Sequence, residues 1–228
     1  MLLVEALLGA TGGLRRKSYT GQAYMGMLSS VETAERQTLH ERLGDLFTYS
    51  EAMRQGLSDR RLYALRDSGE LITLGRGLYR WADAPAANLD LIEIAERVPR
   101  ATLCLETALA HHDLVDTIPA SIDIAIPRGE TRPKLQAPHR LHQFDRSTFH
   151  IGRDTFDVGA RRPLGIYLAE RALIDLVRLR HDQGSELAWE ALRRWLSRHG
   201  RNPGQLITMA GQFKGAEAPL RSALEVLL

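Results

Sequence analysis

Residues 58–67 contain three arginines and a tyrosine and begin with a serine that can cap a helix. At roughly 100° per residue, Leu62 and Leu65 share one face of a helix, and the basic and aromatic side chains lie opposite or flank it. A helix that is apolar inside, basic outside and polar at its N-terminus has the layout of a recognition helix in the major groove of DNA. The predicted DNA-binding residues here are Ser58, Arg60, Arg61, Tyr63 and Arg66.

Each of these side chains has an expected role. Arg60 lies early on the outward face, where an arginine can form a bidentate pair with guanine. Arg61, Arg66 and the hydroxyl of Tyr63 are expected to hold phosphates. The alternative is a solvated face with local ion pairs, because acidic residues stand beside the arginines at both ends of the helix.

The segment after this helix predicts a β-hairpin. Two β-rich runs, residues 71–74 and 78–81, flank the tip Gly75-Arg76-Gly77. Arg76 at the tip is predicted to reach the minor groove or a phosphate, because glycines on either side let backbone come close. Arg80, at the base of the hairpin, is a further predicted contact.

The elements before residue 58 complete a winged helix-turn-helix. Apolar spacing predicts a helix over residues 30–46, and Thr48-x-x-Glu51 is a capping box that opens a second helix. Gly56 is expected to end that helix, and Ser58 to cap the third. Three helices and a hairpin place the DNA-binding domain at residues 31–83, which we expect to fold without the rest of the chain.

The remaining chain divides into an N-terminal extension at residues 1–30, a linker at 84–88 and a second domain at 89–228. The sequence predicts helices in this second domain at 89–98, 106–112, 164–180, 186–199 and 219–228. It predicts strands at 121–126, 139–144 and 149–158. Helices and strands in separate runs indicate an α+β fold.

The composition limits the function classes. A formal net charge of only +2 means that any nucleic-acid surface is a local patch. The single cysteine, Cys104, excludes an intrachain disulfide and a cysteine-cluster metal site, and its apolar surroundings predict a core residue. We find no secretion signal and no membrane-spanning run, so we expect a cytoplasmic protein with no membrane partner.

Few residues of the second domain suggest chemistry. Adjacent His111 and His112 would point about 100° apart on a helix, which is poor for shared metal ligation. Asp123 is a weak catalytic candidate, expected to be a surface residue on an edge strand. Arg171 and Asp175 have the i, i+4 spacing of an ion pair, which we interpret as stabilising a helix. No metal site or cofactor is predicted.

The motifs together resemble the AbiEi family, antitoxins of abortive-infection toxin–antitoxin systems. The resemblance rests on the order of loose motifs along residues 31–228. The matching motifs are Phe47-Thr48-Tyr49-Ser50-Glu51-Ala52, Gly56-Leu57-Ser58-Asp59-Arg60-Arg61-Leu62, Gly69-Glu70-Leu71-Ile72, Gly75-Arg76-Gly77-Leu78-Tyr79, residues 103–112, residues 122–129 and Ala169-Glu170-Arg171-Ala172-Leu173-Ile174-Asp175-Leu176.

The resemblance implies a double role. The winged helix would bind inverted repeats in its own promoter and repress the operon, and the C-terminal domain would neutralise a nucleotidyltransferase-like toxin. Two alternatives stay open. One is an antitoxin that acts enzymatically as an atypical protein kinase on its toxin, which alone would require ATP and Mg²⁺; binding without catalysis is the favoured interpretation. The other is a stand-alone regulator with a ligand-sensing C-terminal domain.

Overall fold

The computed structural model describes residues 33–180 and 185–228. The chain divides into two compact units, Met1–Gly44 and Asp45–Leu228. The described part of the first unit is a helix over residues 33–43, and the start predicted at residue 30 lies outside the described residues. The helix ends earlier than predicted because Gly44 adopts a left-handed conformation, with φ of 69°.

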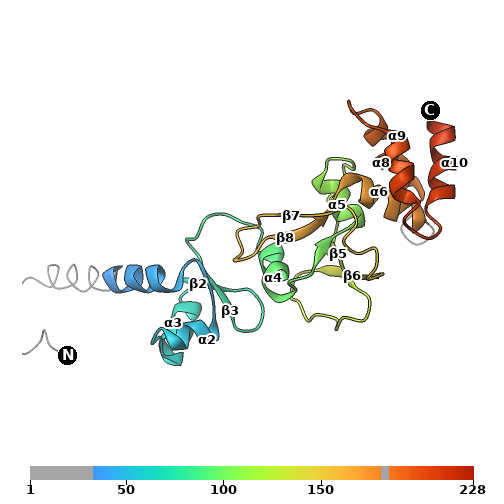
Figure 1. The fold of residues 1–228 in the computed structure, drawn as a ribbon. Helices are drawn as coiled ribbons and strands as arrows, with labels where there is room; N and C mark the ends of the chain where they lie inside the picture. Colours follow the sequence, from blue (N-terminus) through green and yellow to red (C-terminus); the bar gives the residue numbers. More distant parts are fainter. Residues whose placement is uncertain (1–32, 181–184) are drawn as a thin grey trace, which may run out of the picture. The chain divides into compact units, whose positions relative to one another are not determined.

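The second unit begins with a small antiparallel sheet and two short helices (Figure 1). The sheet has the strand order β1-β3-β2. Its strands are β1 (Leu46–Thr48), β2 (Leu71–Thr73) and β3 (Leu78–Trp81), and the helices between them are α2 (Tyr49–Arg54) and α3 (Asp59–Asp67). Leu46, predicted to end the first helix, instead pairs with Arg80 in the sheet. Two helices followed by a β-hairpin are the core of a winged helix-turn-helix.

Helix α4 (Leu89–Arg97) completes the apolar core of the small sheet. Asn88 caps it by accepting hydrogen bonds from the backbone N–H groups of Asp90 and Leu91. Ile92 is fully buried in one cluster with Leu46, Leu74 and Leu78 from the small sheet. Because α4 supplies this side chain, it stabilises the small sheet although it lies beyond the predicted linker.

The larger sheet is mixed, with the strand order β6-β5-β4-β8-β7 (Figure 1). Parallel pairs join β5 to β6 and β4 to β8, and the other neighbours are antiparallel. The strands are β4 (Thr102–Leu103), β5 (Ile122–Pro127), β6 (His139–Phe144), β7 (Arg153–Phe156) and β8 (Leu164–Tyr167).

Helices pack around α6 at the C-terminal end of the chain (Figure 1). They are α5 (Leu105–His111), α6 (Ala169–Arg178), α8 (Ser185–Leu196), α9 (Pro203–Ala210) and α10 (Glu217–Leu227). This mixture of sheets and helices confirms the predicted α+β class. Cys104 is fully buried at the start of α5, as predicted, and burial raises the pKa of its thiol.

The predicted helix over residues 164–180 is wrong in its first turn. Leu164–Tyr167 is the strand β8, all four of whose residues are buried between β4 and β7, and helix α6 begins only at Ala169. A short apolar run fits a buried strand or a buried helix equally well, so periodicity does not distinguish them. The strand predicted over 149–158 is also shorter, because only Arg153–Phe156 pairs with β8.

Arg171 and Asp175 form the predicted i, i+4 ion pair, with Nε and Oδ2 2.7 Å apart. Both side chains are 0% exposed, which the sequence pattern did not indicate. The second nitrogen donor of Arg171, Nη1, bonds the carbonyl oxygens of Thr148 and Ile151 at 2.8 and 2.7 Å. The pair therefore ties α6 to the loop before β7 in the protein core. None of the described helices is long and apolar enough to cross a membrane.

Candidate nucleic-acid interface

The turn between α2 and α3 is fixed by the caps that the sequence predicts. Thr48 accepts a hydrogen bond from the backbone N–H of Glu51, and the Glu51 carboxylate accepts one from the Thr48 backbone, at 3.3 and 2.7 Å. Gly56 follows with φ of 83°. Ser58 then accepts a hydrogen bond from the Arg61 backbone at 3.3 Å. These bonds set where α3 begins and which of its faces is exposed.

Helix α3 has the two faces expected from its sequence. Leu62 is fully buried and Leu65 nearly so. The opposite face is exposed, including Arg60, Arg61 and Tyr63. The predicted residues on this helix thus share one solvent-facing surface.

The arginines on this surface differ in their partners. Within the described part of the chain, the side chains of Arg60 and Arg61 form no ion pair. Arg66 is paired with Asp67 at 2.7 Å, and its guanidinium lies 4.8 Å from the centre of the Tyr63 ring. The Asp67 carboxylate raises the pKa of Arg66, so this cation already has a counter-ion. Arg60 and Arg61 are therefore the more available positive charges, and the local ion pairing of the alternative interpretation applies to Arg66.

Tyr49 connects α3 to the hairpin, and the sequence analysis did not single it out. Its hydroxyl donates a hydrogen bond to the Asp59 carboxylate at 2.6 Å, which raises the pKa of the tyrosine. Its backbone N–H donates to the carbonyl of Gly77 at 2.9 Å. The start of α3 and the end of the hairpin tip thus meet at one residue. Tyr49 lies inside the capping-box motif, but nothing in the motif indicates this contact.

The hairpin tip is held through its backbone. The Gly75 N–H donates to Gln136 Oε1 at 3.1 Å, and Arg97 Nη2 donates to the Arg76 carbonyl at 2.5 Å. A Cβ at Gly75 would collide with Glu93 Oε1 and would lie 2.8 Å from Arg97 Nε. Packing inside the protein therefore explains the glycine at 75, whereas the sequence analysis attributed it to close approach of DNA. The Arg76 side chain itself is exposed.

Gly75→Ala should cost about 2–3 kcal/mol of unfolding free energy, because it combines a strained positive φ of 74° with this collision. Gly56→Ala is a matched control, since Gly56 has φ of 83° but open space around its Cβ position. The control should cost only about 1–2 kcal/mol from backbone strain. Urea denaturation of the two variants measures the difference, and equal losses would mean that the hairpin tip is not closely packed.

Arg80 is not available to DNA. It is 5% exposed, and its Nη2 donates to the carbonyl of Pro85. It lies on β3, the central strand of the small sheet, and the chain after residue 81 contacts its guanidinium through Pro85. The prediction of Arg80 as a contact is therefore wrong, whereas Ser58, Arg60, Arg61, Tyr63, Arg66 and Arg76 all remain on the surface.

Comparison with known proteins places this segment in a family. A family model described as "Transcriptional regulator, AbiEi antitoxin" matches residues 37–82. Residues 37–82, the AbiEi segment, match this family model. The match confirms the resemblance for the part of the chain that carries the predicted recognition helix and hairpin.

One solved structure is similar to this chain over most of its length, but at low sequence identity. The crystal structure of the RV2827C protein from Mycobacterium tuberculosis is similar, with a TM-score of 0.46 and 17% identity. The similarity covers 82% of this chain and 81% of that one. No curated protein matches the chain. The family description matched by residues 37–82 is therefore the observation that suggests an antitoxin and transcriptional regulator.

Outside the AbiEi segment, the structure corrects the expected position of Asp123. It is 0% exposed, and β5 is an inner strand rather than an edge strand. Arg140 donates to both oxygens of its carboxylate, at 2.8 and 2.9 Å, and His142 Nε2 lies 2.9 Å from Oδ1. The prediction of a surface position is wrong because strand β6 places an arginine and a histidine over the Asp123 carboxylate. Asp123 thus stabilises the β5–β6 pair.

The side chains of the two adjacent histidines, His111 and His112, contact other parts of the protein. His112 Nε2 lies 2.8 Å from the carbonyl oxygen of Tyr167, and the His111 ring lies 4.7 Å from the ring of Phe156, centre to centre. Over the described residues, no cluster of three or more His, Cys, Asp or Glu side chains could hold a metal ion.

Proposed function

We propose that this protein is the antitoxin of a bacterial toxin–antitoxin pair and represses its own operon. Helix α3 of the AbiEi segment enters the major groove at inverted repeats in the promoter, and Arg76 contacts a neighbouring phosphate or the minor groove. The observation that carries the proposal is that Arg60 and Arg61 are exposed and form no ion pair with any described residue, on a helix whose start is fixed by Ser58. The remainder of the chain neutralises a nucleotidyltransferase-like toxin.

The proposal assigns Arg60 to a guanine edge and Arg61 to a phosphate. Arg60 lies in the first turn of α3, where a recognition helix approaches the bases. Arg61 flanks it and has no acidic partner to release within residues 33–180 and 185–228. Arg66 contributes less, because its pair with Asp67 must be exchanged for a phosphate. The proposal includes no catalysis, since the carboxylate of Asp123 is occupied by Arg140 and His142.

Arg60→Ala should weaken binding to the promoter repeats by about 1–3 kcal/mol, the cost of losing one bidentate arginine–guanine pair. Fluorescence anisotropy at fixed salt, with a promoter duplex and a scrambled duplex, measures the change. Binding to the scrambled duplex should change far less, because a base contact supplies specificity.

Arg132→Ala is the control, since it removes the same charge from an exposed position outside the AbiEi segment. It should leave promoter binding unchanged. Equal promoter affinity of Arg60→Ala and the unchanged protein would remove Arg60 from the interface, and the same loss in both variants would reduce the effect to net charge.

A further inference from the structure

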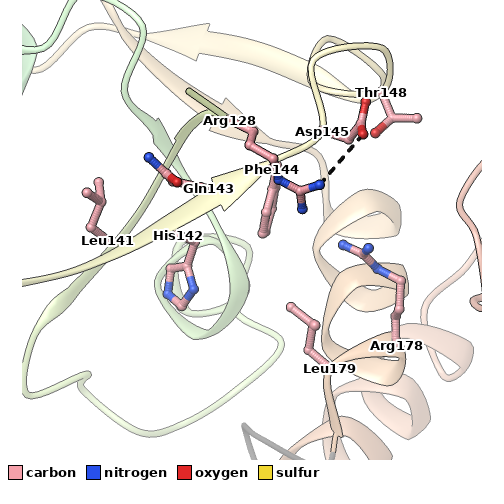
Figure 2. Close-up of a pocket in the computed structure, with 9 residues that line it drawn as sticks. All are labelled: Arg128, Leu141, His142, Gln143, Phe144, Asp145, Thr148, Arg178 and Leu179. Carbon is pink, nitrogen blue, oxygen red and sulfur yellow. Dashed lines mark ion pairs between the residues drawn. The ribbon is translucent and has the colours of Figure 1, made fainter. Parts of the chain in front are cut away.

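A cavity of about 320 Å³ lies between β6, the loop that follows β5, and the end of α6 (Figure 2). Its volume is within the range of small-molecule sites, which begins at roughly 300 Å³. It is far along the chain from the AbiEi segment, and no function discussed above uses it. Its lining combines two arginines with a threonine and several apolar side chains.

The two arginines are the distinctive feature of this cavity. Arg128 comes from the loop after β5, and Arg178 comes from the last turn of α6. Figure 2 shows both guanidinium groups beside Phe144. The Arg178 guanidinium lies 5.8 Å from the centre of that ring. Two like charges directed into one cavity repel each other unless an anion lies with them.

Arg178 also has an unused donor. Its Nη2 donates to Asp175 Oδ1 at 2.8 Å, but its Nε is buried and has no hydrogen-bond partner among the described residues. A buried N–H without an acceptor is costly, so a rotation of the guanidinium that brings Nε to an oxygen of a ligand in the cavity would be favourable. Arginine suits phosphate in particular, because its planar fork of donors matches the oxygens.

The charges around the cavity favour an anion. Asp145 lies on the rim, 4.0 Å from Arg128, and Asp175 lies behind Arg178, where it also pairs with Arg171. Including the buried Arg171, three arginines lie near two carboxylates among the described residues, which is an excess of one positive charge. The Arg128–Asp145 contact is long and exposed, so a bound anion can compete with it.

The other walls are suited to an organic body. Phe144 and Leu179 supply apolar surface on one side of β6, and the ring of His142 is held in place by its contact with Asp123. Thr148 adds a hydroxyl to the lining. We propose that this cavity binds a small organic phosphate, with the phosphate between Arg128 and Arg178 and the organic part of the ligand against Phe144 and Leu179.

Three probes test the phosphate and the organic part of the ligand separately: adenosine monophosphate, adenosine and inorganic phosphate. Isothermal titration calorimetry on the full chain should show binding of the monophosphate, weaker binding of inorganic phosphate and the weakest binding of adenosine. Raising the salt concentration should weaken the first two. Equal binding of adenosine and its monophosphate, or no binding of the monophosphate, would overturn the proposal.

Arg128→Ala should weaken binding of the monophosphate by about tenfold or more, the effect of one charge-assisted hydrogen bond. Its exposed side chain makes this variant safe for folding, and Arg132→Ala is again the control. Arg178→Gln should have a similar effect, with its melting temperature measured alongside because Asp175 loses a partner. Unchanged affinity in Arg128→Ala would contradict the site. The proposal is independent of DNA recognition, since promoter binding by Arg128→Ala should be unchanged.

Discussion

A chain in which Arg60, Arg61 and Arg76 are all replaced by Ala should lose promoter binding but still protect cells that express the toxin. Removing the guanine contact of Arg60, the phosphate contact of Arg61 and the phosphate or minor-groove contact of Arg76 should cost about 3–6 kcal/mol. Since Arg61 is assigned to a phosphate and Arg76 to a phosphate or the minor groove, the slope of log affinity against log salt should also fall by roughly 1–2. All three side chains are exposed, so folding should be retained.

Two assays test this separation of roles. A promoter–reporter fusion measures repression, and growth of cells that express the toxin from an unrelated promoter measures neutralisation. The melting temperature of the purified variant establishes that it is folded. A folded variant that represses poorly and also fails to rescue growth would show that the AbiEi segment takes part in neutralisation itself.

The largest loss of stability is expected from Arg171→Met. This change leaves the buried Asp175 carboxylate with Arg178 as its remaining ion-pair partner, and leaves the carbonyls of Thr148 and Ile151 without this donor. Breaking a buried pair in this way costs about 3–5 kcal/mol. Urea denaturation at neutral pH measures the loss.

The loss should depend on pH. Burial raises the pKa of Asp175 even with the arginines present. The folded state therefore holds the proton of Asp175 to a higher pH than the unfolded state. Stability accordingly falls as the pH rises from the unfolded-state pKa of this carboxyl to its folded-state pKa. In Arg171→Met the pKa rises further, because the strongest opposing charge is gone. The difference in stability between the two proteins should therefore shrink as the pH is lowered from 7 toward 5.

A double variant identifies the cause. Arg171→Met combined with Asp175→Asn removes the stranded carboxylate and should recover at least about 1 kcal/mol relative to Arg171→Met. If the double variant is no more stable, the cost of Arg171→Met lies in the two carbonyls and the lost packing against Tyr167 and Phe213.

The sequence predicted well those elements that are specified by local hydrogen bonds. The capping box at Thr48, the cap at Ser58 and the exposed face of α3 depend on neighbours within a few residues, so spacing alone indicates them. Strand β1 was missed because three residues carry no period, and its partner Leu78–Trp81 lies far along the chain. The helix α9 was missed as well, although Asn202 and Pro203 form a start signal.

The candidate site was predicted less completely where its residues depend on distant contacts. Arg60 and Arg76 are exposed as expected, but the burial of Arg80 follows from the central place of β3, which no local pattern contains. Asp123 was misplaced for the same reason, since its partners Arg140 and His142 come from the next strand. Charge and spacing indicate which residues are candidates for the site, and long-range pairing decides which of these candidates reach solvent.

Ile92 has a consequence for protein engineering. Because this α4 side chain fills the cluster formed by Leu46, Leu74 and Leu78, a chimaera cut at residue 83 would leave an exposed apolar cavity on the small sheet. A graft intended to carry the promoter specificity to another protein should therefore be joined after Val98, where α4 ends. The portable unit for exchange then includes a helix that sequence motifs assign to the other half of the chain.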